Sequence, residues 1–220
     1  MTIPASEIAQ QRTVRLIPTA HYKPPVLRAL VDDDDELAIL EGLEGRASKR
    51  LVNPAATVDL DYGRWGRSFI AAAFTYCRRG GSRFNGETLG AWYAGFDDRT
   101  SLSEVAHHKT RELSYIDYYH DEVQYRALQA SFIGRFHDIR TLQPALECLH
   151  PEPEVGYPAG QRLANDLIQQ GSRGLIYPSV RNEGGVCLVA FQPNVVQDVA
   201  PGACWSIRWE GSPNWTATAA

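Results

Sequence analysis

The 220-residue sequence contains no long apolar run. A membrane-spanning helix needs roughly 20 consecutive apolar residues, and no window of the chain approaches that length. Residues 1–15 also lack the apolar centre of a secretory signal peptide. We therefore expect no membrane contact and a cytoplasmic location.

Cysteine is scarce and scattered along the chain. No Cys-x-x-Cys pair, the spacing that structural zinc sites commonly use, occurs among Cys77, Cys148, Cys187 and Cys204. Isolated cysteines in a chain of this size favour reduced thiols in a cytoplasm. We predict neither a disulfide framework nor a bound metal.

An acidic run, Asp32–Glu36, offers another candidate for a metal site, but it lacks the ligand spacing of a calcium loop. Acidic residues at the start of a helix stabilise it through the helix dipole. Leu37, Leu40 and Leu43 then follow at helical spacing. We therefore interpret residues 32–50 as a helix with a solvated acidic start.

An excess of basic charge is absent as well. The chain has 22 Lys and Arg against 26 Asp and Glu, for a formal net charge of −4. Proteins whose main partner is nucleic acid usually carry a basic field, so we expect no direct nucleic-acid contact. The hydrophobic share of 44% and the charged share of 22% are those of a globular protein with one sizeable core.

The remaining pattern mixes helices and strands without the regular alternation of a doubly wound sheet, which predicts a single α+β domain. Expected helices are residues 68–76 and 161–170; expected strands are residues 13–18, 89–96, 122–132, 136–142, 174–180, 186–191 and 205–209. Segments expected to be irregular or loosely held are residues 1–12, the proline-rich residues 144–158 and a disordered tail at residues 212–220.

The residues with the most chemical capability gather between Gly80 and Leu113. Arg83 lies in a glycine-flanked loop, and Tyr93 lies in the strand predicted next. Glu104 follows Ser101 at capping-box spacing in the first turn of a predicted helix. Each has an ordinary interpretation, as a surface arginine, a strand tyrosine and a helix-capping glutamate, and strand alternation lets only one of Trp92 and Tyr93 face a given pocket.

Four short segments of this sequence, SRFN, WYAG, SLSEVAHH and GLIYPSVRNEGG, resemble the RES-domain toxins, the NAD-consuming members of toxin–antitoxin pairs. Arg83, Tyr93, Glu104 and Ser179 match the Arg, Tyr, Glu and Ser of that family. The resemblance implies a mixed, split β-sheet core similar to ADP-ribosyltransferases of the diphtheria-toxin type. It also implies three parts, which are an N-terminal helical extension packed on the core (1–78), a RES-type catalytic core (79–211) and a flexible tail (212–220).

The activity that the resemblance implies is cleavage of NAD+, as substrate, at the nicotinamide–ribose bond. This reaction develops positive charge on the ribose, as in glycosidases, and groups already in place must stabilise that charge. We expect Glu104 to do so, Arg83 to hold the pyrophosphate or ribose side, and Tyr93 to offer a ring face to nicotinamide.

Ser179 is expected to donate a hydrogen bond to the substrate or to Glu104. It does not lie in a Gly-x-Ser-x-Gly elbow, so a serine hydrolase is the weakest interpretation. His108 lies four positions after Glu104, on the same helix face, and is a candidate for binding the substrate. Asn182, just beyond Ser179, is a second such candidate.

The acceptor of the ADP-ribose stays open at this point. A protein side chain would make the enzyme a mono-ADP-ribosyltransferase, whereas phosphate or water would make it an NAD+ phosphorylase or glycohydrolase. Arg78, Arg79 and Arg181 are candidates for a basic hole that binds phosphate. A non-enzymatic nucleotide-binding or partner-binding module is the alternative from another class. The resemblance also implies an antitoxin partner with a helix-turn-helix region, whose C-terminal part blocks the active site.

Overall fold

A computed structural model describes residues 2–22 and 65–220, together with isolated positions between them. The helix predicted at residues 32–50 lies largely outside the described residues. Within the described part, no helix is long and apolar enough to cross a membrane.

The described chain forms a mixed sheet in the order β1-β2-β5-β4-β3-β6-β7. Its strands are β1 (Ala5–Pro18), β2 (Trp92–Gly95), β3 (His120–Asp138), β4 (Gly174–Pro178), β5 (Val186–Ala190), β6 (Gln197–Glu210) and β7 (Trp215–Ala219). The β3–β4 pair is parallel, and the other pairs are antiparallel.

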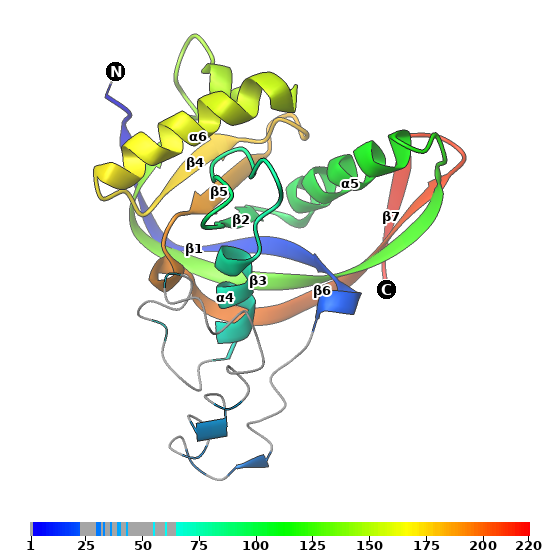
Figure 1. Cartoon of the computed structure of the whole chain (residues 1–220), viewed down its shortest axis with the longest axis horizontal. Helices are drawn as coiled ribbons and strands as arrows, with labels where there is room; N and C mark the ends of the chain where they lie inside the picture. Colours follow the sequence, from blue (N-terminus) through cyan, green and yellow to red (C-terminus); the bar gives the residue numbers. More distant parts are fainter. Residues whose placement is uncertain are drawn as a thin grey trace.

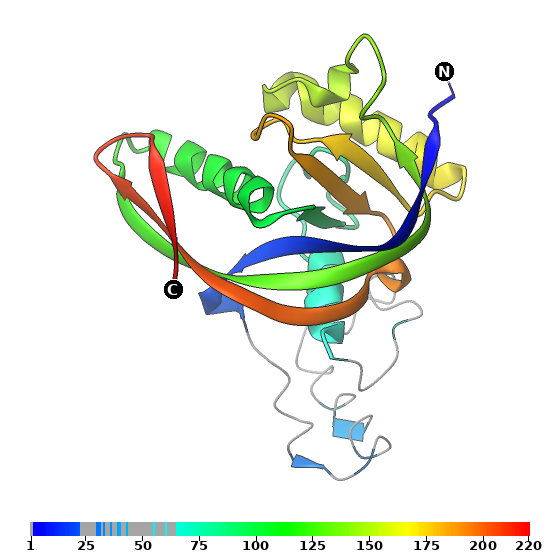
Figure 2. The same cartoon turned by 180° about the vertical axis from the view of Figure 1, so that it is seen from behind.

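The sheet is split into a long half and a short half. Strands β1, β3, β6 and β7 form a long curved half, and β2, β5 and β4 form a short one (Figures 1 and 2). The halves meet where Val14 of β1 opposes Gly95 of β2 and where the end of β3 runs parallel to β4. The predicted α+β fold with a mixed, split core is therefore confirmed.

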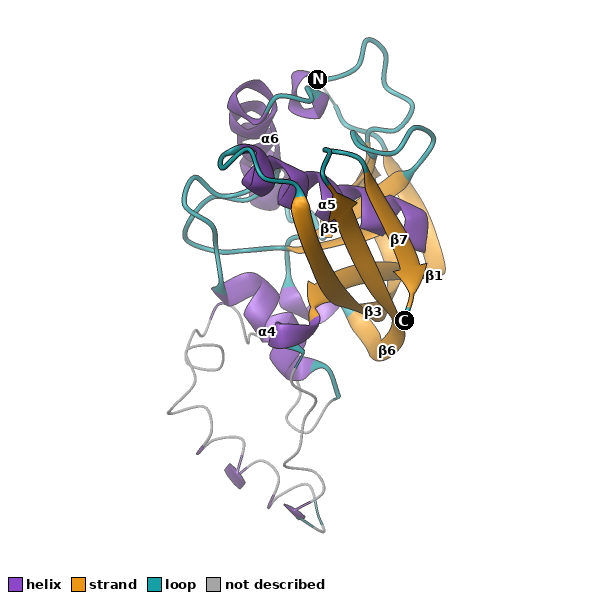
Figure 3. Cartoon of the chain, turned by 90° about the vertical axis from the view of Figure 1, so that its right-hand side faces the viewer, coloured by secondary structure: helices purple, strands orange, loops and turns teal. Residues whose placement is uncertain are grey.

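Three α-helices are described beside this sheet, namely α4 (Arg67–Thr75), α5 (Asp98–Ser114) and α6 (Pro153–Gln169), with 3-10 turns η1 (Thr19–His21), η3 (Glu147–Leu149) and η4 (Pro193–Val195). Helices α5 and α6 lie on the concave side of the long strands, together with the short half of the sheet (Figures 1 and 2). Figure 3 shows β3, β6 and β7 side by side. Helix α4 confirms the helix predicted at residues 68–76.

Each helix covers its own part of the core. Phe74 of α4 packs with Trp92 and Phe132, Leu167 of α6 packs with Leu175, and Leu102, Ala106 and Leu113 of α5 pack against β3 and β6. Burial of these apolar side chains is the main force that fixes each helix on the sheet. The site described below lies where the three groups approach one another.

The N-terminal segment differs from its prediction. Strand β1 begins at Ala5, so residues 5–12 of the segment predicted to be loosely held are paired strand, and residues 5–18 belong to the central sheet rather than to a helical extension. Between Ile8 and Gln11 the pairing with β3 shifts register. A bulge inserts an extra residue and reverses the alternation of side chains, which hides the strand from a search for a period of two.

Strands β3 and β6 are longer than predicted. Strand β3 continues to Asp138, so residues 136–138 of the separate extended piece predicted at residues 136–142 are the end of β3, and residues 139–142 form a turn. Strand β6 starts at Gln197 and contains Pro201 and Gly202, which usually interrupt strands. Irregular pairing opposite Leu128 accommodates this Pro-Gly pair.

Helix α6 begins at Pro153, earlier than the predicted residue 161, so the irregular segment predicted at residues 144–158 ends at Glu152. Proline at the first helical position lacks only an N–H that would have no partner within the helix. Pro153 therefore marks the start of a helix rather than a loop, and Pro158 lies inside that helix.

The C-terminal residues are not a disordered tail. Strand β7 pairs with β6 from Trp205↔Ala219 to Trp209↔Trp215. Trp209 is buried, and its indole Nε1 donates a 2.8 Å hydrogen bond to Thr110 of α5. Strand β7 therefore pairs with the edge of β6, the strand against which α5 packs.

We predict that truncation after Gly211 lowers the midpoint of thermal unfolding by on the order of 5 °C. Five cross-strand pairs are lost, each contributing about 0.2–1 kcal/mol, and a domain of this size shifts by about 2–4 °C per kcal/mol. Differential scanning fluorimetry measures the shift, with Thr216→Ala, at an exposed position, as the control. An unchanged midpoint after truncation would contradict a folded role for β7.

Candidate active site

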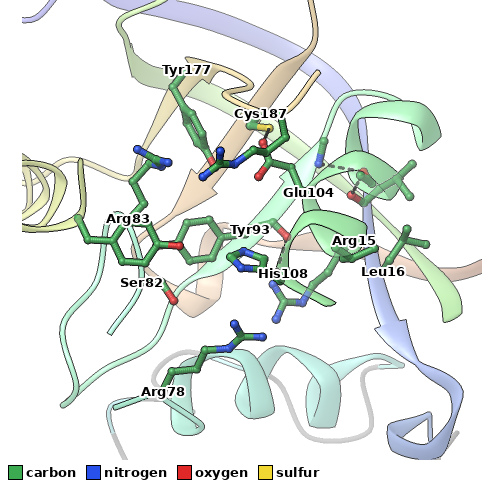
Figure 4. A pocket seen from close by; sticks show the side chains of 17 residues that line it. Arg15, Leu16, Arg78, Ser82, Arg83, Tyr93, Glu104, His108, Tyr177 and Cys187 are labelled. Carbon is green, nitrogen blue, oxygen red and sulfur yellow. Dashed lines mark hydrogen bonds between the residues drawn. The ribbon is translucent and has the colours of Figure 1, made fainter. Parts of the chain in front are cut away.

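A central pocket of about 240 Å³ opens between β1, β2, α5, α6 and the β4–β5 pair. Arg83, Tyr93, Glu104 and His108 line it, although they come from a loop, a strand and a helix (Figure 4). Ser179 reaches the pocket through Glu104. The four family-matching residues therefore converge in space.

Glu104 owes its position to the way in which α5 begins. The N-cap is Asp97, whose carboxylate accepts a 2.6 Å hydrogen bond from the N–H of Thr100. The predicted capping box is wrong, because the Ser101 hydroxyl instead donates to the carbonyl of Val14 at 2.8 Å and accepts from the N–H of Gly95. Glu104 is thus free of any capping role.

One oxygen of Glu104 is held by two neighbours. The Ser179 hydroxyl donates to Oε1 at 2.7 Å, and the Cys187 thiol lies 3.7 Å from the same oxygen. Burial, followed by the charge of Glu104, raises the pKa of the Cys187 thiol, which keeps it protonated as a donor. Ser179 Oγ also accepts from the backbone N–H groups of Arg181 and Asn182, so its own proton is directed at the carboxylate.

Arg83 is buried and anchored rather than exposed on a surface loop. Its Nη1 donates to the carbonyl of Cys148 at 2.5 Å and of His150 at 2.9 Å, and its guanidinium carbon lies 5.4 Å from the ring centroid of Tyr157. Helix α6 approaches closely at Gly160, where a Cβ would lie 2.1 Å from the Arg83 carbonyl oxygen. The arginine is therefore fixed in place before any ligand binds.

Tyr93 uses its hydroxyl to hold the arginine loop. The phenol oxygen accepts from the N–H of Phe84 at 2.9 Å and donates to Asn85 Oδ1 at 2.9 Å. Burial raises the pKa of Tyr93 far above its ordinary value, so the phenol stays neutral. Trp92 packs in a different core cluster, as strand alternation predicts.

Two further arginines line the pocket, Arg15, which was not predicted, and Arg181, which was predicted as a candidate for binding phosphate. Arg15 of β1 donates to the carbonyl of Tyr93 at 3.1 Å and lies 5.1 Å from the ring centroid of Trp92, and burial lowers its pKa to about 10. Arg181 donates to the carbonyl of Pro151 at 2.6 Å.

The charge of the pocket is opposite in sign to that of the chain. Among the described lining residues there is one carboxylate, Glu104, against four guanidinium groups, those of Arg15, Arg78, Arg83 and Arg181. Arginine binds oxyanions through several N–H groups and keeps its charge. The pocket therefore suits an anionic ligand.

The histidine pair of α5 is neutral in this setting. Burial, followed by the charge of Arg78, lowers the pKa of His108 to about 3, and burial, followed by the charge of Arg181, lowers that of His107 to about 4. His108 Nδ1 is buried without a hydrogen-bond partner. A buried unpaired nitrogen is unfavourable, so His108 has an unused capacity to contact a ligand.

Asn182 does not line the pocket. Its Nδ2 donates to the Thr100 hydroxyl at 3.0 Å, and this contact joins the turn after β4 to the first turn of α5. Its observed role is to hold the Ser179 turn against the helix that carries Glu104. Among the described residues, no group of three or more His, Cys, Asp or Glu side chains lies together where it could hold a metal ion.

Sequence reasoning missed Arg15, Tyr157 and Tyr177 as pocket residues. Arg15 lies in the strand predicted at residues 13–18, but nothing in its local sequence indicates that its side chain faces the pocket, and Tyr157 lies in a stretch predicted to be irregular. Tyr177 lies within the matching word GLIYPSVRNEGG and was the one that local sequence could have indicated.

The structure is thus a split α+β fold with a basic pocket that is arranged around one oriented carboxylate. The family model of the RES domain matches residues 59–210, and the chain belongs to the RES domain family. The match begins before the boundary predicted at residue 79.

The crystal structure of the M. tuberculosis MbcT-MbcA toxin-antitoxin complex is similar at 12% sequence identity and a TM-score of 0.45, covering 90% of this chain and 87% of that chain. No curated protein matches the chain.

We predict that His108 makes stability depend on pH. The folded-state pKa of His108, about 3, is below its ordinary value of 6.5, so the unfolded chain binds the proton more tightly. The free energy of unfolding should therefore fall as pH is lowered from about 6.5 towards 3, by at most about 1.4 kcal/mol per pH unit for this group.

Urea denaturation at pH 7 and pH 5 measures this dependence. His108→Gln should lose less stability than the unmutated chain between the two values, whereas His120→Gln, at an exposed position, should behave like the unmutated chain. Equal losses in all three proteins would contradict a buried neutral His108.

Proposed function

We propose that this chain is the toxin of a toxin–antitoxin pair and that it cleaves NAD+ at the nicotinamide–ribose bond. Membership of the RES domain family supports this proposal. The observation that carries the chemistry is the 2.7 Å hydrogen bond from Ser179 to Glu104 inside an arginine-lined pocket. A fixed carboxylate of this kind suits a reaction that develops positive charge on a sugar.

In the proposed reaction the bond between the ribose C1′ and the nicotinamide nitrogen breaks. The bonding electron pair stays with the nitrogen, so nicotinamide leaves as a neutral molecule and the ribose becomes oxocarbenium-like. A nucleophile then bonds to C1′ and loses its proton. Both donors to Glu104 approach Oε1, so Oε2 is available to a ribose hydroxyl and to the developing charge.

Arg83 and Tyr93 have distinct roles in this proposal. Arg83 Nη1 is committed to two backbone carbonyls, and the other nitrogens of its guanidinium group are assigned to the phosphate or ribose side of NAD+. The Tyr93 hydroxyl is committed to the arginine loop, and its ring is assigned to nicotinamide. His108, whose pKa is lowered by burial, contacts the substrate as a neutral group.

The acceptor in our proposal is a protein side chain, which makes the enzyme a mono-ADP-ribosyltransferase. Inorganic phosphate is the second candidate, and the guanidinium groups of Arg78 and Arg181 in the pocket favour it, because they offer an oxyanion site beside the substrate. Mass spectrometry of NAD+ incubated with the purified chain distinguishes the two. ADP-ribose 1″-phosphate formed only in phosphate identifies a phosphorylase, and a lysate protein that gains one ADP-ribose identifies a transferase.

The partner in this proposal is a cognate antitoxin with a helix-turn-helix region, whose C-terminal part occupies the pocket. Contacts with DNA then belong to the antitoxin, in keeping with the net charge of −4 on this chain.

We predict that Glu104→Gln lowers the rate of nicotinamide release by at least roughly 100-fold, because it removes the charge that stabilises the transition state. The folded state should persist, since glutamine can still accept the hydrogen bond of Ser179. Glu112→Gln, on the same helix but exposed, is the matched control and should retain activity. Chromatography measures the rate of nicotinamide release for each variant. Full turnover by Glu104→Gln would refute the role of this carboxylate.

We predict that Ser179→Ala lowers kcat about tenfold, through loss of one oriented hydrogen bond, with little change in KM. Ser179 is a positioning residue that acts through Glu104. In a Glu104→Gln background the same serine substitution should therefore have almost no further effect. A full additional tenfold loss in the double variant would show that Ser179 acts independently of Glu104.

A further inference from the structure

The central pocket is too small for the whole of NAD+. Its volume of about 240 Å³ lies below the roughly 300–1,000 Å³ of sites that enclose drug-sized ligands, and NAD+ consists of two nucleotides. Two further cavities adjoin it, and Arg78 lines all three. The second nucleotide therefore extends past Arg78 into one of them.

One of these cavities, which we call the α5–α6 cleft, has a volume of about 350 Å³ and lies between the two helices. Three arginines line it, Arg78, Arg79 and Arg111, and none of them forms an ion pair with a carboxylate of the described chain. Arg111 Nε is buried without a hydrogen-bond partner. Unpaired guanidinium groups facing one cleft indicate an oxyanion ligand.

Two tyrosine rings lie in the same cleft. Tyr157 lines both this cleft and the central pocket, and the guanidinium carbon of Arg83 lies 5.4 Å from its ring centroid. Tyr115, just after α5, is 75% exposed and packs in no described core cluster. Exposed aromatic rings beside arginines are the usual composition of surfaces that stack a nucleobase and bind its phosphate.

The other cavity, which we call the α4 cavity, is larger at about 860 Å³ but suits phosphate less well. Its Lys109 is paired with Asp121 at 2.8 Å, and its Arg15 is held by the Tyr93 carbonyl. Each of the two cavities has one carboxylate in its described lining, Glu112 here and Glu154 in the α5–α6 cleft, so the carboxylates do not distinguish them. Apart from Arg78, which both cavities share, its cations are already committed to protein partners.

We propose that the α5–α6 cleft binds the adenosine monophosphate half of NAD+, with Arg78 at the pyrophosphate where the ligand leaves the central pocket. This assignment rests on the proposed function, and it adds a binding site for the non-reacting half of the substrate. Tyr115 stacks against the adenine ring, and Arg79 and Arg111 neutralise phosphate charge. Nicotinamide and its ribose occupy the central pocket beside Glu104.

Steady-state kinetics with NAD+ and with nicotinamide mononucleotide, which lacks the adenosine half, test this assignment. Tyr115→Ala should raise the KM for NAD+ roughly tenfold through loss of stacking, with kcat nearly unchanged and with no effect on the mononucleotide. Tyr76→Ala, at an exposed tyrosine of the α4 cavity, is the matched control and should leave both substrates unaffected. An increase caused by Tyr76→Ala instead would overturn the assignment.

Titration of the purified chain with AMP separates this proposal from the proposed activity. AMP should bind the unmutated chain and Glu104→Gln alike, and Tyr115→Ala and Arg111→Gln should each weaken it about tenfold. This result would support the cleft even if NAD+ were never cleaved. No binding of AMP at millimolar concentration, or binding that neither substitution weakens, would refute the cleft whatever the activity.

Discussion

The hydrogen bond between Ser179 and Glu104 is the contact on which the arrangement of this site depends. It joins α5, which follows the short strand β2, to the turn that follows β4. The backbone N–H groups of Arg181 and Asn182 fix the serine, and Asn182 fixes the turn to Thr100. Contacts from two segments distant in sequence therefore hold the carboxylate in one orientation. A site needs such a fixed orientation before charge develops on a substrate.

The arginines of the pocket are also held in place by contacts within the protein. Burying a cation is unfavourable unless other groups compensate for its lost hydration. Backbone carbonyls compensate Arg83, Arg15 and Arg181, and Arg83 and Arg15 also face aromatic rings. Carbonyls hold each guanidinium group without neutralising it. The pocket therefore keeps a net positive charge, which carboxylate partners would have cancelled.

The sequence could predict the parts of this site that lie within short segments. Four matching words contain Arg83, Tyr93, Glu104 and Ser179. The strand and the helix predicted after the arginine loop are both present, although their observed bounds differ from the predicted ones. The capping box was a reasonable local prediction. Asp97 is the N-cap instead, because Ser101 is buried beneath β1, where its hydroxyl donates a hydrogen bond to the carbonyl of Val14. Arg15 and Tyr157 could not be found, because the pairing of β1 with β2 and β3 sets the position of Arg15, and the early start of α6 at Pro153 sets that of Tyr157.

The neutral histidines indicate how the pocket and its ligand are linked. His107 and His108 stay uncharged because they are buried near arginines. Beside burial, the charge of Arg78 lowers the pKa of Arg15 and the charge of Arg83 lowers the pKa of Arg181, so the guanidinium groups repel one another in the folded chain. An anion that binds between these groups relieves the repulsion and stabilises the folded state by mass action. The same cations that select an anionic substrate therefore make the empty pocket the least stable form of the site, and this follows from the charges whichever acceptor completes the reaction.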